Sequence, residues 1–329
     1  MKQKASLFTG AFCVLAVILL LKLPWRSEPV PPPLGPSEVI PLKVITFNVQ
    51  FLPGIGAFFN KRPDAEYRAR TLAHLLAKDY DIIGLNEVFD SSCQDLLLDG
   101  LRERLGENFH CVTSPKCERS SFGIGSGLVL VTRLPVLASH SLRYGNDSSV
   151  WKYGLWADGF AAKGALHARL SRGRDAAAHD TLDVFVTHLE SQDPVVREAQ
   201  YAKLAEFIRA FSAPNRPALI LGDFNTDGRP NCLKDPASQY QRMYETLKHA
   251  RPSASFIDLW PSLSSEPGGT NDPDIPDGGE RIDYIFLSNP ADARPRLRPT
   301  AVRVNQFLDA KMKSLSDHCA VEVDLLWER

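Results

Sequence analysis

Several apolar runs of this sequence end beside a polar side chain that a buried strand does not need. The residues concerned are Asn48, Glu87, His188, Asp223, Asn225, Asp317 and His318. Catalytic groups often lie where strands meet loops, because the sheet fixes their positions while the loops leave them open to substrate. We therefore expect these side chains to gather on one rim of a sheet.

The residue types in this set point to metal-assisted hydrolysis. Oxygen ligands, with one or two carboxylates among them, are what Mg²⁺ prefers in proteins. A histidine with a pKa near neutrality can take a proton from water, and a second histidine can assist a leaving group. Taken singly, each residue has an ordinary explanation as a turn residue, a cap or a buried polar neighbour. Taken together, they predict a site for Mg²⁺, or alternatively Mn²⁺, with acid–base groups beside it.

Short apolar runs along the chain predict the strands that must position these residues. They cover residues 43–47, 81–85, 127–131, 182–186, 218–221, 282–287 and 320–325. Between them, apolar side chains within 67–76 and 204–211 recur on one helical face. Strands mixed with helices predict a layered α/β domain whose sheets are covered by helices. Residues 266–280, rich in Gly, Pro and Asp, predict a surface loop.

Residues 1–24 predict a membrane-targeting segment. Residues 5–21 form an uncharged stretch of 17, whereas a spanning helix takes about 17 to 25 residues and a signal-peptide core about 7 to 15. No small-x-small cleavage site is obvious after Leu21, which favours an uncleaved anchor over a cleaved signal peptide. The positive N-terminus is expected to stay cytoplasmic. The rest of the chain is then extracytoplasmic, in a periplasm, a lumen or the extracellular space, and secreted if the segment is cleaved.

Behind this segment, the sequence predicts a linker and one mildly acidic domain. Residues 25–38 contain the run PVPPPLGP, which favours an extended spacer. The catalytic domain is expected to span 39–329. Residues 1–28 carry four Lys or Arg side chains and one Glu, so the remainder has a formal charge of −4 when the whole chain has −1. Because duplex binding relies on clustered Lys and Arg, this charge disfavours nucleic acid as the substrate.

Five cysteines follow Cys13 of the hydrophobic segment, and none of them forms a metal-type C-x-x-C pair. Cys111 and Cys117 close a short loop that a disulfide could bridge in an oxidising compartment. Buried free thiols are the equally weighted alternative, since the number is odd and the sequence does not assign partners.

Five motifs in order along the chain resemble those of the endonuclease/exonuclease/phosphatase superfamily, which includes DNases, apurinic endonucleases, inositol phosphatases and neutral sphingomyelinases. They are TFNVQ, GLNEV, VTHLES, LGDFNTD and the pair RIDYIFLS with SDHCAVEV, between residue 43 and about residue 325. The resemblance implies a four-layer fold of two packed mixed β-sheets flanked by helices. It also implies metal-dependent hydrolysis of a phosphate ester.

Carried over position by position, the resemblance implies a metal side of the site. Glu87 is implied to be the principal Mg²⁺ ligand, with Asn48 beside it. Asp317, which adjoins the histidine of the SDH motif, is implied to support the metal.

The same resemblance implies the catalytic residues. Asp223 and Asn225 of the GDFN motif are implied to position the nucleophile and a phosphate oxygen. His318 is implied to be the general base, oriented by Asp283 of the RIDY motif. His188 is implied to donate a hydrogen bond to the phosphate or a proton toward the leaving group.

The middle of the chain is similar to neutral sphingomyelinases. In WKYGLWADGFAAKGALHARL, Asp158 precedes Lys163 by five positions, and the resemblance implies that this pair orients substrate or regulates an active-site loop. The ordinary alternative is an ion pair at a strand turn. Trp151, Tyr153 and Trp156 are of a kind that favours membrane interfaces, although core packing is their more common role.

These observations predict a sphingomyelinase-like phosphodiesterase that acts on a phospholipid or sphingolipid at a membrane surface and leaves ceramide or a similar lipid. An exported DNase-type endonuclease would use the same set of site residues, but an acidic domain is less suited to binding DNA. A phosphatase-type relative remains open. A non-catalytic lipid-binding module is a further alternative, against which the intact set of polar residues argues. No obligate protein partner is expected.

Overall fold

The structure, a computed structural model, describes residues 39–54, 62, 64–115, 124–145, 152, 161–172, 180–290 and 295–328. The predicted N-terminal segment and linker lie outside these residues, as do Asp158 and the three aromatic residues near it. Within the part described, no helix is both long enough and apolar enough to cross a membrane.

Twelve strands are found in the described residues, in two sheets of six. The first sheet holds β1 (Val39–Phe51), β2 (Ile82–Val88), β3 (His110–Thr113), β4 (Val129–Thr132), β11 (Arg296–Asn305) and β12 (Ala320–Glu328). The second holds β5 (Val136–Arg143), β6 (Gly164–Ser171), β7 (Thr181–His188), β8 (Ala218–Asp223), β9 (Ala254–Asp258) and β10 (Asp283–Pro290). The strand orders are β11-β12-β1-β2-β4-β3 and β5-β6-β7-β8-β10-β9. Both sheets are mixed, because β1 and β2 pair in parallel, as do β7 and β8, while the other pairs are antiparallel.

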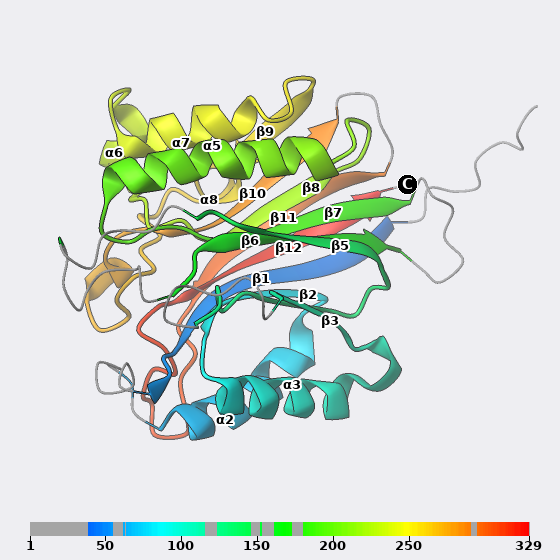
Figure 1. Cartoon of the computed structure of the whole chain (residues 1–329), viewed down its shortest axis with the longest axis vertical. Coiled ribbons are helices and arrows are strands. Elements are labelled where there is room, and N and C mark those ends of the chain that lie inside the picture. Colours follow the sequence, from blue (N-terminus) through cyan, green and yellow to red (C-terminus); the bar gives the residue numbers. More distant parts are fainter. Residues whose placement is uncertain are drawn as a thin grey trace, which may run out of the picture. The chain divides into compact units, whose positions relative to one another are not determined.

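Helices cover the outer face of each sheet (Figure 1). The first sheet packs against α2 (Ala65–Asp79) and α3 (Ser91–Leu105), and the second against α5 (Pro194–Phe211) and α7 (Gln239–Lys248). Shorter helical segments are η2 (Gly106–Asn108), α6 (Pro230–Lys234), α8 (Leu259–Leu263) and η5 (Pro276–Gly278). The layers are thus helices, sheet, sheet and helices, which confirms the predicted four-layer α/β fold.

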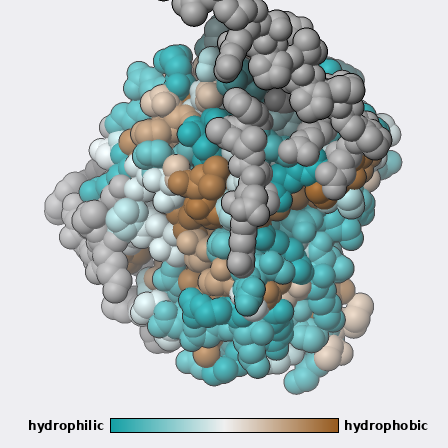
Figure 2. All heavy atoms as spheres, turned by 90° about the vertical axis from the view of Figure 1, so that its right-hand side faces the viewer, coloured by the Kyte–Doolittle hydropathy of each residue, from teal (hydrophilic) through white to brown (hydrophobic). Residues whose placement is uncertain are grey.

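Alternation along β1 explains how one strand serves two cores. Leu42 and Val44 belong to the apolar core between the sheets, whereas Ile45, Phe47 and Val49 pack against α2 and α3. Successive side chains of a strand point to opposite faces, so a nearly continuous apolar run is what a sheet buried on both faces needs. On the face shown in Figure 2, hydrophilic side chains cover most of the described surface, with apolar ones exposed in a band between them.

Each predicted apolar run lies in or overlaps a strand, and the two predicted helical stretches lie in α2 and α5. Strands β3, β5, β6, β9 and β11 were not predicted, because their residues are partly polar or exposed. The four described cysteines, which include Cys111, are free thiols, and Cys117 lies outside the described residues.

Candidate active site

Three polar residues lie in one row across the second sheet, at the edge where β7 and β8 end. His188 pairs with Asp223, and Asp223 pairs with Asp283. In each strand, the residue that lies two positions from the polar one belongs to the apolar core between the sheets. These core residues are Val186, Leu221 and Ile285. Because side chains two residues apart in a strand point to the same face of the sheet, the three polar side chains lie on the same face as this core, at its edge.

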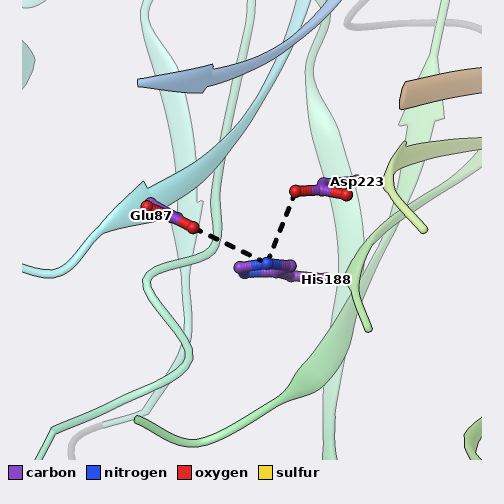
Figure 3. A group of neighbouring side chains, drawn as sticks. All are labelled: Glu87, His188 and Asp223. Atoms are coloured by element: carbon purple, nitrogen blue, oxygen red, sulfur yellow. Dashed lines mark ion pairs between the residues drawn. The ribbon is translucent and has the colours of Figure 1, made fainter. Parts of the chain in front are cut away.

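The first sheet brings Asn48 and Glu87 to the same edge. Asn48 donates a hydrogen bond from Nδ2 to Oδ2 of Asp223 over 3.0 Å, which joins the two sheets. Strict alternation after Leu85 would turn Glu87 toward α2 and α3, but Glu87 has a left-handed backbone with φ of 59°. We attribute to that conformation the turn of its carboxylate toward the second sheet, where Oε1 lies 3.8 Å from Nε2 of His188 (Figure 3).

Left-handed backbone conformations gather around this edge. Glu87, Asn225 and Gln50 have φ of 59°, 48° and 50°. A side chain at Gly222, one residue before Asp223, would meet a backbone oxygen of β7 at 2.0 Å, so only glycine fits there. Such conformations cost about 1–3 kcal/mol each in residues other than glycine and are typical of functional sites.

His188 is buried among charged groups. Its Nε2 lies 2.8 Å from Nζ of Lys163 and 3.5 Å from Oδ2 of Asp223. Burial, followed by the charges of Lys163 and His318, lowers the pKa of His188 well below its ordinary value. The ring is therefore neutral at pH 7 and accepts a hydrogen bond from the Lys163 ammonium.

His318 forms a dyad with Asp283. Nδ1 of His318 lies 2.9 Å from Oδ2 of Asp283, and Nε2 lies 3.9 Å from Oδ2 of Asp223. Burial lowers the pKa of His318, but Asp283, Asp223 and Asp317 together outweigh burial and raise that pKa well above its ordinary value. With Nδ1 held by Asp283, Nε2 is the nitrogen left for proton transfer at the site.

Two carboxylates at the centre of the site resist ionisation. Burial and then the charge of Asp317 raise the pKa of Glu87 to about 7. Burial and then the charge of Asp283 raise the pKa of Asp223 to about 6. Buried carboxylates of this kind gain stability from an added cation.

Among the described residues, two groups have ligand atoms within 4.8 Å of one another. Glu87, His188 and Asp223 form the first, and Asp223, Asp283 and His318 form the second. The oxygen donors at the junction of the sheets, from Glu87, Asp223 and Asn48, suit a hard divalent cation.

Asn225 and Asp317 lie next to these groups without belonging to them. The backbone N–H of Asn225 donates to Oδ1 of Asp223 over 2.9 Å, and its side-chain Nδ2 donates to the carbonyl of Leu189 over 2.9 Å. Oδ2 of Asp317 accepts a hydrogen bond from Nε2 of Gln50.

Thr270 was not identified as a site residue from the sequence. It lies in the predicted surface loop but is fully buried. Its Oγ1 accepts from the backbone N–H groups of Ile282 and Asp283, both over 3.2 Å, and its carbonyl accepts from the N–H of Cys319 over 2.7 Å. Thr270 thus ties together the two segments that carry the Asp283–His318 dyad. A threonine in a Gly- and Pro-rich loop carries no signal of such a role.

Comparisons with known proteins find relatives in sequence and in fold. Sphingomyelinase C of Bacillus cereus is 26% identical over 270 residues, which cover 75% of this chain and 75% of that protein. Sphingomyelinase C 2 of Leptospira interrogans is 27% identical over 273 residues, which cover 77% of this chain and 40% of that protein. A mutant β toxin of Staphylococcus aureus, solved with bound magnesium ions, has a similar fold, with a TM-score of 0.60, 18% identity and coverage of 86% of this chain and 99% of that one.

The model of the Endonuclease/Exonuclease/phosphatase family matches residues 45–318, which include every described member of the site. This range runs from the middle of β1 to the residue that completes the dyad, and of the twelve described strands only β12 lies wholly beyond it. The chain therefore belongs to the Endonuclease/Exonuclease/phosphatase family.

Proposed function

We propose that the chain is a divalent-metal-dependent phosphodiesterase that hydrolyses sphingomyelin or a related phospholipid to a ceramide-like lipid and phosphocholine. Family membership supports a hydrolase, and the similarity to sphingomyelinases supports the lipid substrate. The observation that carries the proposal is the meeting of Glu87 and Asn48 of one sheet with His188, Asp223 and the His318 dyad at one edge.

The metal side of the site would be formed by Glu87, Asp223 and Asn48. Their oxygen donors and the raised pKa values of the two carboxylates fit a hard divalent cation, for which we propose Mg²⁺ or Mn²⁺. When bound there, the ion offsets the charge of the phosphodiester and polarises its phosphorus centre.

The base is proposed to be His318. Asp283 holds its Nδ1, so Nε2 takes the proton of the attacking water. The surrounding carboxylates raise the pKa of His318, so its ring stays protonated until a bound cation offsets their negative charge. Only then would Nε2 be free to take a proton from water. Asp223 lies 3.9 Å from the same Nε2 and is placed to orient the water, with Asn225 beside it.

His188 and Lys163 are proposed to bind the phosphate oxygens of the substrate. Lys163 supplies a positive charge at 2.8 Å from His188 and is almost completely buried, which strengthens its attraction for an anion. Asp158 lies outside the described residues, and its role in orienting substrate or regulating an active-site loop stays a prediction.

The setting is proposed to be a membrane surface outside the cytoplasm. The sequence of residues 5–21 supports an anchor, and a formal charge of −4 beyond residue 28 disfavours a duplex as substrate. A lipid in the same membrane would then be within reach of a tethered enzyme.

The test is a competition among substrate classes. The full chain in mixed micelles is incubated with Mg²⁺ and, in parallel, with head-group-labelled sphingomyelin, with phosphatidylcholine and with supercoiled plasmid DNA. We expect release of phosphocholine from sphingomyelin, which stops when the metal is chelated and returns when Mg²⁺ is restored. Nicking of the plasmid without lipid hydrolysis would assign the chain to a nuclease activity, and release that resists chelation would contradict the role of the metal.

Metal affinity is expected to fall as the pH is lowered. Glu87 and Asp223, with pKa values raised to about 7 and about 6, carry protons in this range that a cation must displace. Between pH 8 and pH 6, the apparent affinity for Mg²⁺ should therefore weaken by about tenfold or more. Calorimetry in two buffers of different ionisation heat should also detect proton release at pH 6.5, and equal affinities at both pH values would contradict this expectation.

Thr270→Val is expected to impair catalysis while leaving the metal site intact. Valine has nearly the same shape but leaves two buried N–H groups without their acceptor, at a cost of about 1–3 kcal/mol in stability. Because one of those groups belongs to Asp283, kcat should fall about tenfold with metal affinity unchanged. Thr246→Val is the matched control, because it removes a hydroxyl on α7 that donates to the carbonyl of Arg242, away from the site. Equal kcat values for the two variants would argue against a role for Thr270 in holding the dyad.

A further inference from the structure

Gln50 connects the metal side of the site without being one of the expected ligands. Its backbone N–H donates to Oδ1 of Asn48 over 3.2 Å, and Asn48 donates in turn to Asp223 over 3.0 Å. The side-chain Nε2 of Gln50 donates to Oδ2 of Asp317, 267 positions further along the chain. One residue therefore contacts both Asn48 and Asp317.

The conformation of Gln50 is costly. Its φ of 50° lies in the left-handed region, which costs a residue with a Cβ about 1–2 kcal/mol. Only 6% of the residue is exposed, and Oε1 of its amide is buried without a hydrogen-bond partner in the described structure. A glycine at this position would remove the backbone strain, and a leucine would avoid burying an amide oxygen without a partner. Neither of them could donate a hydrogen bond to Asp317, as the glutamine amide does.

The backbone around Gln50 is held independently of its side chain. Arg68 of α2 is 2% exposed, and it donates to the carbonyls of Val49, Leu315 and Gln50 over 2.8, 2.9 and 2.8 Å. Ser316 donates from Oγ to the carbonyl of Asn48 over 2.6 Å, which links the same two segments again. Removing the Gln50 amide alone should therefore leave the chain folded and these segments in place.

Asp317 matters to the site through its charge. It immediately precedes His318, and its Oδ2 accepts from the amide of Gln50 on β1, the strand that also carries Asn48. From there its charge acts on Glu87. It also raises the pKa of His318. A carboxylate with this influence on both sides of the site needs a fixed direction, because rotation of the group would change the field at each.

We infer that Gln50 is a positioning residue of the metal site, whose side-chain amide fixes the carboxylate of Asp317 beside Glu87 and so maintains affinity for the divalent ion. This inference rests on the proposed function, since it assumes an ion at Glu87. Partners that orient the groups around a metal typically contribute about 10- to 100-fold in affinity.

The experiment compares Gln50→Leu with the wild-type full chain by calorimetric titration with Mn²⁺. Leucine keeps the approximate volume of glutamine and removes only the amide. We expect metal affinity to fall about tenfold or more. Gln241→Leu is the matched control, because Gln241 is a partly buried glutamine on α7 whose Nε2 donates to the carbonyl of Leu233. It should lose an amide hydrogen bond without loss of metal affinity.

A double-mutant cycle separates action through Asp317 from a general effect. In an Asp317→Ala background, Gln50→Leu should weaken metal binding no further than about twofold, since the group that the amide orients is gone. If binding in that background is too weak for calorimetry, the rise in Tm with added Mn²⁺ is compared instead. Equal losses in both backgrounds, or wild-type or tighter binding by Gln50→Leu, would overturn the inference.

Failure of the proposed function and failure of the role of Gln50 would give different results. If the wild-type chain binds no divalent ion, the proposed function itself fails. If the wild-type chain binds the ion and hydrolyses the lipid while Gln50→Leu behaves identically, only the role of Gln50 fails.

Discussion

His318→Gln is expected to lower kcat by about 10²- to 10⁴-fold, the usual contribution of a positioned acid–base group. Glutamine keeps a polar side chain of similar length but cannot take a proton from water at Nε2. Asp283→Asn should have a smaller effect in the same direction, because it weakens the contact of 2.9 Å that orients the ring without removing the base. Steady-state hydrolysis of sphingomyelin at saturating Mg²⁺ measures both.

Folding and metal binding are the controls for this result. His318→Gln should still fold and should bind Mg²⁺ with an affinity within a few-fold of the wild type, since His318 is assigned to proton transfer. Its Tm should fall, because the buried carboxylate of Asp283 loses its charged partner. His249→Gln, on an exposed histidine at the end of α7, should behave as wild type in every assay. Retention of more than about a tenth of the wild-type kcat by His318→Gln would contradict the assignment of His318 as the base.

Glu87→Gln is expected to weaken the response to metal strongly. The substitution keeps the shape of the side chain and removes the negative charge, so affinity for Mg²⁺ should fall by about 100-fold or more, by analogy with the loss of a direct partner of a buried charge. Activity should fall in parallel and recover in part at high metal concentration. A metal titration of Glu87→Gln that overlays that of the wild type would exclude Glu87 as the principal ligand.

The same variant has a distinct signature in stability. Because the pKa of Glu87 is raised from 4.5 to about 7 in the folded protein, the metal-free fold binds this proton more tightly than the unfolded chain. The stability contributed by that proton is lost as the pH rises from about 4.5 through about 7. The Tm of metal-free Glu87→Gln should therefore fall less over this pH range than the Tm of the metal-free wild type. The Tm of Glu103→Gln, a substitution on the exposed face of α3, should fall as much as that of the wild type.

Much of the fold and most of the row of site residues could be predicted from the sequence. The inner strands are apolar on both faces, and although one polar residue at the end of such a strand has ordinary explanations, several of them together indicate a functional site. His188 and Asp223 follow this rule directly, because they continue the core rows of β7 and β8. Strands at or near the sheet edges, such as β5 and β11, are partly exposed and lack that signature.

The direction of Glu87 and the supports of the site could not be predicted in this way. Alternation alone turns Glu87 away from the site, and the left-handed φ that brings it back leaves no trace in a glutamate. Thr270 and Gln50 act through contacts with segments that are 13 and 267 positions away. Contacts of this kind depend on how loops close over the finished sheets, which local sequence patterns do not encode.

The proposed function requires one divalent ion where the two sheets meet. The most direct measurement is anomalous diffraction from crystals of the full chain containing Mn²⁺. We expect a single strong anomalous peak about 2.1 Å from a carboxylate oxygen of Glu87, on the side that faces Asp223 and Asn48. An ordered Glu87 with no peak beside it, in crystals whose protein hydrolyses sphingomyelin in solution, would contradict the account.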